Sequence, residues 1–151
     1  MSEHRASVAW ERKTPDFAHE TYDRTHQVAF PGGQSLRGSA APEYKGDAAC
    51  ANPEELLASA LASCHMLTFL AIAARSRLVV AAYQDEAVAT LAKDAEGRLA
   101  VTAIALRPRV RWGGPAPDAA RLRELHEKAH RNCFVGASLR GQVTVEPREW
   151  A

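Results

Sequence analysis

The sequence predicts an α+β fold in which antiparallel strands surround one long, central, buried helix. An apolar stretch over 53–75 begins at a clear helix start signal, and short apolar segments separated by turn residues lie on both sides of it. The chain has 151 residues, which is enough for one domain with a substantial core and too few for two comfortable ones. We therefore expect a single domain over residues 1–151.

The start of the long helix has the most specific local signal in the chain. Asn52 is placed as the N-cap, Pro53 occupies the first helical position, and Glu54 and Glu55 lie in the first turn. Glu55 can complete an Asn variant of the capping box. These residues predict a helix from Pro53 to about Arg75.

That helix approaches the length of a membrane span. Its composition argues against one, because alanines make it only weakly hydrophobic and polar side chains interrupt it. These are Ser59, Ser63, Cys64, His65 and Thr68. We expect a helix in the core of a soluble protein.

Strands are expected on both sides of the helix. Before it, residues 5–10, 25–30 and 34–39 have the pattern of short strands. After it, the extended segments 78–91 and 98–112 flank a hairpin turn at 94–97. Neither face of 99–106 is strongly polar, so helices or a partner chain are expected to cover both faces.

The C-terminal part predicts a second helix. Pro117 and Asp118 open it, and an apolar face recurs at helical spacing. A short helical turn through Ser138 and a closing strand at 141–146 are expected after it. The face of the second helix is formed by Leu122, Leu125, Ala129 and Asn132.

Composition excludes some functions. With 19 basic and 18 acidic residues and a net charge of +1, there is no electrostatic case for binding nucleic acid or a membrane surface. Three cysteines is an odd number, and residues 1–20 are charged throughout without the apolar segment of a signal peptide. We expect a cytoplasmic protein with reduced thiols.

Two cysteines are candidates for redox chemistry. Cys64 lies within the long apolar helix, whereas Cys133 closes the charged amphipathic segment 126–133. Most free cysteines behave as small buried hydrophobes, and this is the alternative for both. If the fold brings them together, one can attack a peroxide as a thiolate and the other can resolve the product. Cys50, before the N-cap, has no visible chemical partner and is interpreted as incidental.

Residues 8–146 resemble the OsmC/Ohr family of osmotically inducible and organic hydroperoxide resistance proteins. Asn52-Pro53-Glu54-Glu55-Leu56-Leu57, followed by Ala62-Ser63-Cys64, is similar to the family's Asn-Pro-Glu-x-Leu block and its peroxidatic cysteine. Residues 129–133 are similar to the segment with the second cysteine. After the first cysteine this chain has His65, where the family commonly has an apolar residue. After the second it has Phe134, where the family often has proline. This pattern resembles a less studied branch of the family.

The resemblance implies an OsmC-like fold built as an intertwined homodimer with two active sites at its interface. It implies a peroxidase that reduces organic hydroperoxides, and hydrogen peroxide more weakly, through a disulfide between Cys64 and Cys133. An external dithiol, either a lipoyl protein or a small thiol, would regenerate the enzyme, and no cofactor or metal is expected. An arginine and Glu54 would orient and ionise the reactive thiol.

The chemistry of Cys64 requires a cation nearby, because a thiol is mostly protonated at neutral pH. The helix dipole cannot supply the charge, since it fades within the first turn. Arg24, beside the strand at 25–30, is the preferred candidate over Arg12, although each is otherwise a solvated loop charge. Glu54 lies about 15 Å along the helix from Cys64, so it is expected to serve a partner's site. Its alternative role is to complement the helix dipole.

The same cysteines and histidines also allow other functions. A metal site could use Cys64, His65, His130 and Cys133, although adjacent Cys64 and His65 point about 100° apart on a helix. A second alternative is a thiol redox sensor or small-molecule binder without turnover. His65 is either a local proton donor or, preferably, a hydrogen-bonded core histidine.

Overall fold

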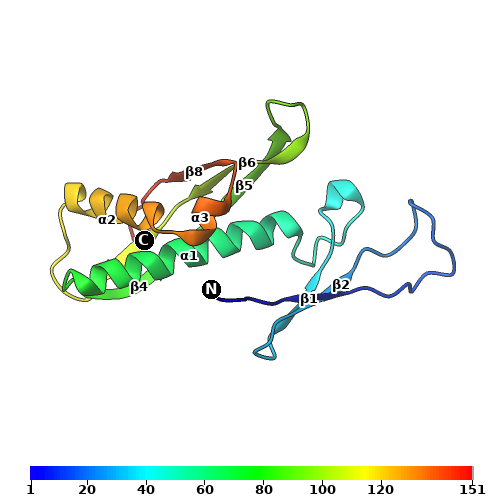
Figure 1. Ribbon diagram of the computed structural model, residues 1–151, viewed down its shortest axis with the longest axis horizontal. Helices are drawn as coiled ribbons and strands as arrows, with labels where there is room; N and C mark the ends of the chain where they lie inside the picture. Colours follow the sequence, from blue (N-terminus) through cyan, green and yellow to red (C-terminus); the bar gives the residue numbers. More distant parts are fainter. Residues whose placement is uncertain (151) are drawn as a thin grey trace. The chain divides into compact units, whose positions relative to one another are not determined.

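The computed structural model describes residues 1–150 and divides into two compact units, Met1–Leu56 and the chain from Leu57 onward (Figure 1). The predicted α+β class is confirmed. The described residues contain three α-helices, a short 3-10 helix and several strands. The expectation of one domain over the whole chain stays a prediction.

The first unit contains a three-stranded antiparallel sheet in the order β1-β2-β3. The strands are β1 (Ser7–Ala9), β2 (His26–Ala29) and β3 (Ser35–Gly38), each inside a segment predicted to be extended. Gly33, in the turn between β2 and β3, has a φ of 82°, which glycine adopts without steric cost. A 3-10 helix, η1 (Pro42–Tyr44), follows β3 and leads toward the long helix.

Helix α1 (Pro53–Arg75) has the predicted bounds. The capping box is confirmed, since the Asn52 side chain accepts from the Glu55 amide at 2.8 Å and the Glu55 carboxylate accepts from the Asn52 amide at 2.9 Å. The helix ends at Arg75. Two residues later Arg77 has a left-handed φ of 60°, and the Leu78 amide donates back to the Ala73 carbonyl at 3.0 Å. By length and composition α1 could also cross a membrane, which is weak evidence because core helices meet the same test.

Each of the two long extended segments predicted after α1 breaks into two strands. The first segment, predicted over 78–91, contains β4 (Val80–Gln84) and the start of β5 (Val88–Lys93), which extends two residues beyond it. The second, 98–112, forms β6 (Leu99–Leu106) and β7 (Arg109–Trp112). Pro108 has no amide hydrogen to continue a ladder. The Arg107 amide donates instead to the Asp85 carboxylate at 2.7 Å. The predicted long pairing of the two segments is therefore interrupted here, and their strands belong to two separate sheets.

The sheets of the second unit are β4-β7 and β5-β6-β8. The hairpin predicted at 94–97 joins β5 to β6, and the Gly97 amide donates to the Asp94 carbonyl at 2.9 Å. The closing strand β8 (Gln142–Val145) pairs parallel with β6. This sheet is consequently mixed, where antiparallel pairing alone was expected.

The two predicted C-terminal helices are α2 (Ala119–Arg131) and α3 (Phe134–Ser138). Asp118 caps α2 by accepting from the Arg121 amide at 2.8 Å. Leu125 and Ala129 are buried as the apolar face predicts, whereas Asn132 is exposed.

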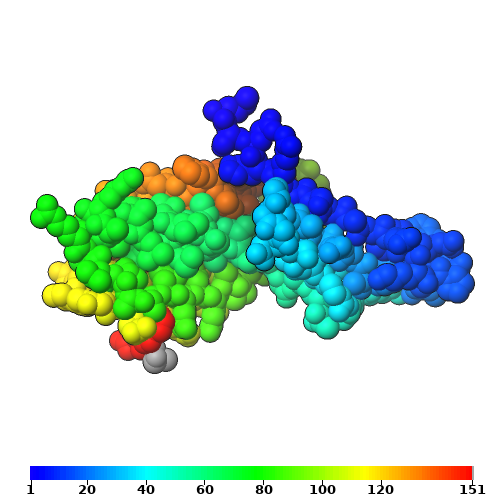
Figure 2. Space-filling model, turned by 90° about the horizontal axis from the view of Figure 1, so that it is seen from below, coloured from blue at the N-terminus to red at the C-terminus, as the bar shows by residue number. Residues whose placement is uncertain are grey.

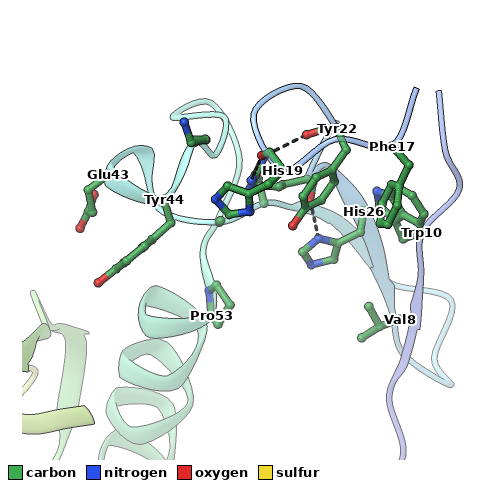
Figure 3. Close-up of a pocket in the computed structure, with 13 residues that line it drawn as sticks. Val8, Trp10, Phe17, His19, Tyr22, His26, Glu43, Tyr44 and Pro53 are labelled. Atoms are coloured by element: carbon green, nitrogen blue, oxygen red, sulfur yellow. Dashed lines mark hydrogen bonds between the residues drawn. The ribbon is translucent and has the colours of Figure 1, made fainter. Parts of the chain in front are cut away.

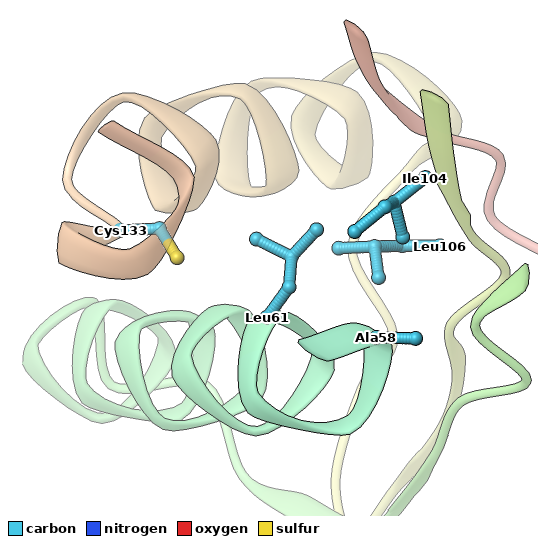
Figure 4. Packing of buried hydrophobic residues seen from close by; sticks show 5 residues of the cluster. All are labelled: Ala58, Leu61, Ile104, Leu106 and Cys133. Carbon is cyan, nitrogen blue, oxygen red and sulfur yellow. The ribbon is translucent and has the colours of Figure 1, made fainter. Parts of the chain in front are cut away.

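The core of the second unit consists of two clusters that both pack against α1. The first joins α1 to β6 and to the residue before α3, and Figure 4 shows its five buried members: Ala58, Leu61, Ile104, Leu106 and Cys133. The second joins α1 to α2 and contains Phe69, Ile72, Ala73, Leu125 and Ala129. On the opposite side of α1, residues such as Ala60, Ser63 and Leu67 are exposed, and green atoms of this part of the chain can be seen on the face shown in Figure 2. The predicted central helix is therefore buried along one side only.

Candidate active site

Cys64 and Cys133 lie side by side in the first core cluster. Cys64 is a half-buried residue in the middle of α1, and Cys133 is only 1% exposed at the N-cap of α3. Their side chains pack together in this cluster, and the Cys133 sulfur points toward α1 (Figure 4). The Gly136 amide also donates to the Cys133 Sγ at 3.3 Å. The fold thus brings together the two candidate cysteines, both as free thiols.

The two thiols differ in their surroundings. Burial, together with the hydrogen bond to Cys64, raises the pKa of the Cys133 thiol to about 11, although the Gly136 amide opposes this effect. Cys133 is therefore protonated at neutral pH. Cys64 is the more exposed residue of the pair, which suits the thiol that meets a substrate first.

His65 is a hydrogen-bonded core histidine, as preferred from the sequence. It is fully buried, and its Nε2 lies 3.1 Å from Nδ1 of His126 on α2. The two rings are nearly parallel, and Phe69 stacks on His126 at 4.3 Å between ring centroids. Burial lowers the pKa of His65 to about 4 and that of His126 to about 3, so both rings are neutral. His126 was missed from the sequence, and its signal is its place on the apolar face of α2, four residues after Leu122.

Arg24 lies in the first unit and lines a cavity of 630 Å³. Figure 3 shows the labelled side chains of this cavity, including Trp10 and Tyr22. The Arg24 guanidinium donates to the carbonyls of His19 at 2.7 Å and Tyr22 at 2.9 Å, and it stacks over the Tyr22 ring at 4.0 Å from the centroid. The cavity is lined mainly by aromatic and basic side chains, among them Trp10, Phe17, His19, Tyr22, His26 and Lys45. Sequence reasoning missed this cavity, although aromatic residues do gather in and beside the otherwise polar segment 11–23.

The other proposed activating residues are placed as follows. Arg12 is exposed and donates to the Pro15 carbonyl at 2.8 Å, and it does not line the cavity. Glu54 is half-buried in the first turn of α1. The pairing of Arg24 and Glu54 with Cys64 stays a prediction.

The remaining candidates from the sequence are Cys50 and a metal site. Cys50 is 8% exposed, and its thiol donates to the Asp47 carboxylate at 3.6 Å. Within residues 1–150, no three or more histidine, cysteine or acidic side chains are grouped so that they could hold a metal ion. The metal-binding alternative therefore has no ligand set in this part of the chain.

Comparison with known proteins gives concordant results. The family model for OsmC-like proteins matches residues 46–148. An OsmC-like protein of unknown function from Vibrio cholerae is 40% identical, with a TM-score of 0.93 over 98% of this chain and 100% of that chain. No curated protein matches.

Two solved structures of lower identity share the fold. An organic hydroperoxide resistance protein from Legionella pneumophila is 18% identical, with a TM-score of 0.70 over 100% of both chains. The organic hydroperoxide resistance protein OhrB of Bacillus subtilis is 20% identical, with a TM-score of 0.66 over 97% of this chain and 98% of that chain. On the family model and the Vibrio cholerae relative together, this chain belongs to the OsmC-like family.

Proposed function

We propose that this protein is a cysteine-based peroxidase that reduces organic hydroperoxides, and hydrogen peroxide more weakly. The observation that carries the proposal is the pair of free thiols, Cys64 and Cys133, which pack together in a largely apolar cluster. The hydroperoxide resistance proteins of Legionella pneumophila and Bacillus subtilis, which share the fold, point the same way.

In the first step, Cys64 acts as the peroxidatic residue. Its thiolate attacks the terminal oxygen of the hydroperoxide, an S–O bond forms, and the O–O bond breaks. The alkoxide takes up a proton and leaves as the alcohol, while Cys64 becomes a sulfenic acid. Apolar neighbours of Cys64 favour an alkyl hydroperoxide over hydrogen peroxide, because they offer the alkyl group a surface that excludes water.

In the second step, Cys133 resolves the sulfenic acid. Its sulfur attacks the Cys64 sulfur, the S–S bond forms, and hydroxide leaves with the proton of Cys133 as water. The raised pKa of Cys133 disfavours this thiol as the residue of the first step, and its contact with Cys64 supports a role for it in the second. An external dithiol, either a lipoyl protein or a small thiol, then supplies two electrons and two protons to restore both thiols. Such a cycle suits a reducing cytoplasm.

A homodimer completes the proposal. Leu67 is 60% exposed and Phe134 is 85% exposed, and both line a groove over α1 and the C-terminal end of α2. A second copy would cover this apolar surface. It would also allow Glu54 and Arg24 of one subunit to serve Cys64 of the other, since Glu54 cannot reach its own Cys64 along one helix. Sedimentation at micromolar concentration should then give twice the chain mass of 16.4 kDa.

The decisive experiment follows alkyl hydroperoxide consumption with a dithiol reductant. Cys64→Ser should abolish turnover, whereas Cys133→Ser should consume one equivalent and then stall with Cys64 as a sulfenic or more oxidised acid. Cys50→Ser is the matched control and should retain turnover, because Cys50 is bonded to Asp47 outside the thiol pair.

Equal loss of the single turnover in both variants would refute the division of roles. A wild-type protein that forms the disulfide with one equivalent of peroxide but is not turned over by any dithiol would instead be a redox sensor.

A further inference from the structure

The buried pair of His65 and His126 connects the helices that carry the two thiols. His65 follows Cys64 directly in α1, and His126 lies on α2 seven residues before Cys133. Both rings are buried, with His126 only 3% exposed, and their nitrogens lie 3.1 Å apart. A neutral imidazole can donate through one nitrogen and accept through the other, so one ring donates this hydrogen bond to the other.

The pair is poorly explained as a device for stability. Nδ1 of His65 and Nε2 of His126 are buried without a hydrogen-bond partner. Burying such groups costs free energy, and an apolar pair of similar shape would avoid that cost. A role that depends on the geometry of this hydrogen bond explains the presence of two histidines better than packing does.

The geometry shows what the hydrogen bond fixes. Phe69, one turn after His65 on α1, stacks on His126, so the His126 ring is held between two side chains of α1. Cys133 continues from the end of α2, where its amide donates to the His130 carbonyl at 3.3 Å. A shift of α2 along α1 therefore moves the Cys133 sulfur relative to Cys64.

We propose that His65 and His126 are positioning residues whose mutual hydrogen bond sets the register of α2 on α1 and thereby holds Cys133 in line to form the disulfide with Cys64. The physiological meaning of this step rests on the proposed peroxidase function. The geometric claim concerns only the closure of the Cys64–Cys133 disulfide, which any thiol oxidant can test.

Closure can be measured without peroxide by using oxidised glutathione. The Cys64 thiolate attacks the glutathione disulfide, releases one glutathione thiolate and forms a mixed disulfide. The deprotonated Cys133 then attacks the Cys64 sulfur and expels the second glutathione. The second step is intramolecular, and rapid acid quench with mass spectrometry follows the decay of the mixed disulfide. The Cys50→Ser background removes the third thiol.

The first set of variants keeps or removes the one polar atom through which each histidine makes the mutual hydrogen bond. A Gln amide places a polar atom near the position of a histidine Nε2, and an Asn amide places one near Nδ1. His65→Gln and His126→Asn should therefore keep much of the closure rate. His65→Asn and His126→Gln should slow closure by about tenfold or more, since small misplacements of reacting groups have effects of this size.

The double variant His65→Phe/His126→Phe separates positioning from stability. It removes the unpartnered nitrogens together with the hydrogen bond, so its melting temperature should be equal to or above that of the wild type. Closure of the disulfide should nevertheless be slowed at least as much as in His65→Asn and His126→Gln. Leu125→Ala, a buried neighbour of His126 on α2, is the matched control, and it should lower the melting temperature more than it slows closure.

Wild-type closure in a folded double Phe variant would overturn the proposal. So would a slowing that follows the loss of melting temperature across all variants, Leu125→Ala included, because packing alone would then explain the effect. Failure of the proposed function is distinct from both results, since it would leave glutathione-driven closure intact while hydroperoxide is not consumed.

Discussion

Raising the pH should destabilise the folded protein through Cys133. Its pKa is raised from 9.0 to about 11 in the fold, chiefly by burial. A group that binds its proton more tightly when folded stabilises the fold below its unfolded pKa, and this contribution is lost as pH rises through the folded pKa. Each pKa unit corresponds to about 1.4 kcal/mol, so the full effect is about 3 kcal/mol, and about 2 kcal/mol of it should be lost between pH 9 and 11.

The assay is urea denaturation at several pH values between 8 and 11, with a phosphine reductant present. Cys133→Ser is the reference, because serine does not titrate in this range and other groups, including Tyr83, contribute equally to both proteins. The difference in unfolding free energy between wild type and Cys133→Ser should shrink as pH rises. A difference that is constant with pH would show that Cys133 is not buried as a neutral thiol.

Further predictions concern the core, the activating charge and a helix cap. Leu61→Ala removes a fully buried side chain between α1 and β6 and should lower the unfolding free energy by about 2–5 kcal/mol in urea denaturation. Val79→Ala, at a side chain 59% exposed just after the same helix, should change it by less than about 0.5 kcal/mol, and equal losses would contradict the assignment of the buried face. Arg24→Ala should slow alkylation of Cys64 at neutral pH with poor rescue by Arg24→Lys, whereas Arg12→Ala should not, and the opposite order would reassign the activating residue. Asp118→Ala should cost about 1 kcal/mol in thermal or urea unfolding, because the cap of α2 is lost, and an unchanged stability would show that the cap is not needed.

Local sequence was sufficient wherever the structure depends on neighbours in the chain. The capping box of Asn52 and Glu55 and the Asp118 cap are interactions within one turn of helix, so residue types and spacing reveal them directly. The hairpin at 94–97 and the paired cysteine motifs were likewise visible in the sequence. These features were enough to predict the α+β class and the resemblance to the OsmC/Ohr family.

Extended segments were predicted less well, because a strand is defined by its partners. The breaks near Asp85 and Pro108 depend on a hydrogen bond between residues 22 positions apart, and the parallel pairing of β8 with β6 depends on where the chain returns. Periodicity along a single segment contains neither fact.

The site shows the same division. The sequence by itself determined which two cysteines are candidates and that the His65 side chain belongs to a helix. Only the tertiary structure decided that Cys64 and Cys133 pack together, that His65 pairs with His126, and that Arg24 lies at an aromatic cavity. These contacts join segments far apart in the chain, and their geometry follows from how α1 packs against α2 and how the first unit folds its loop, neither of which is encoded in local spacing.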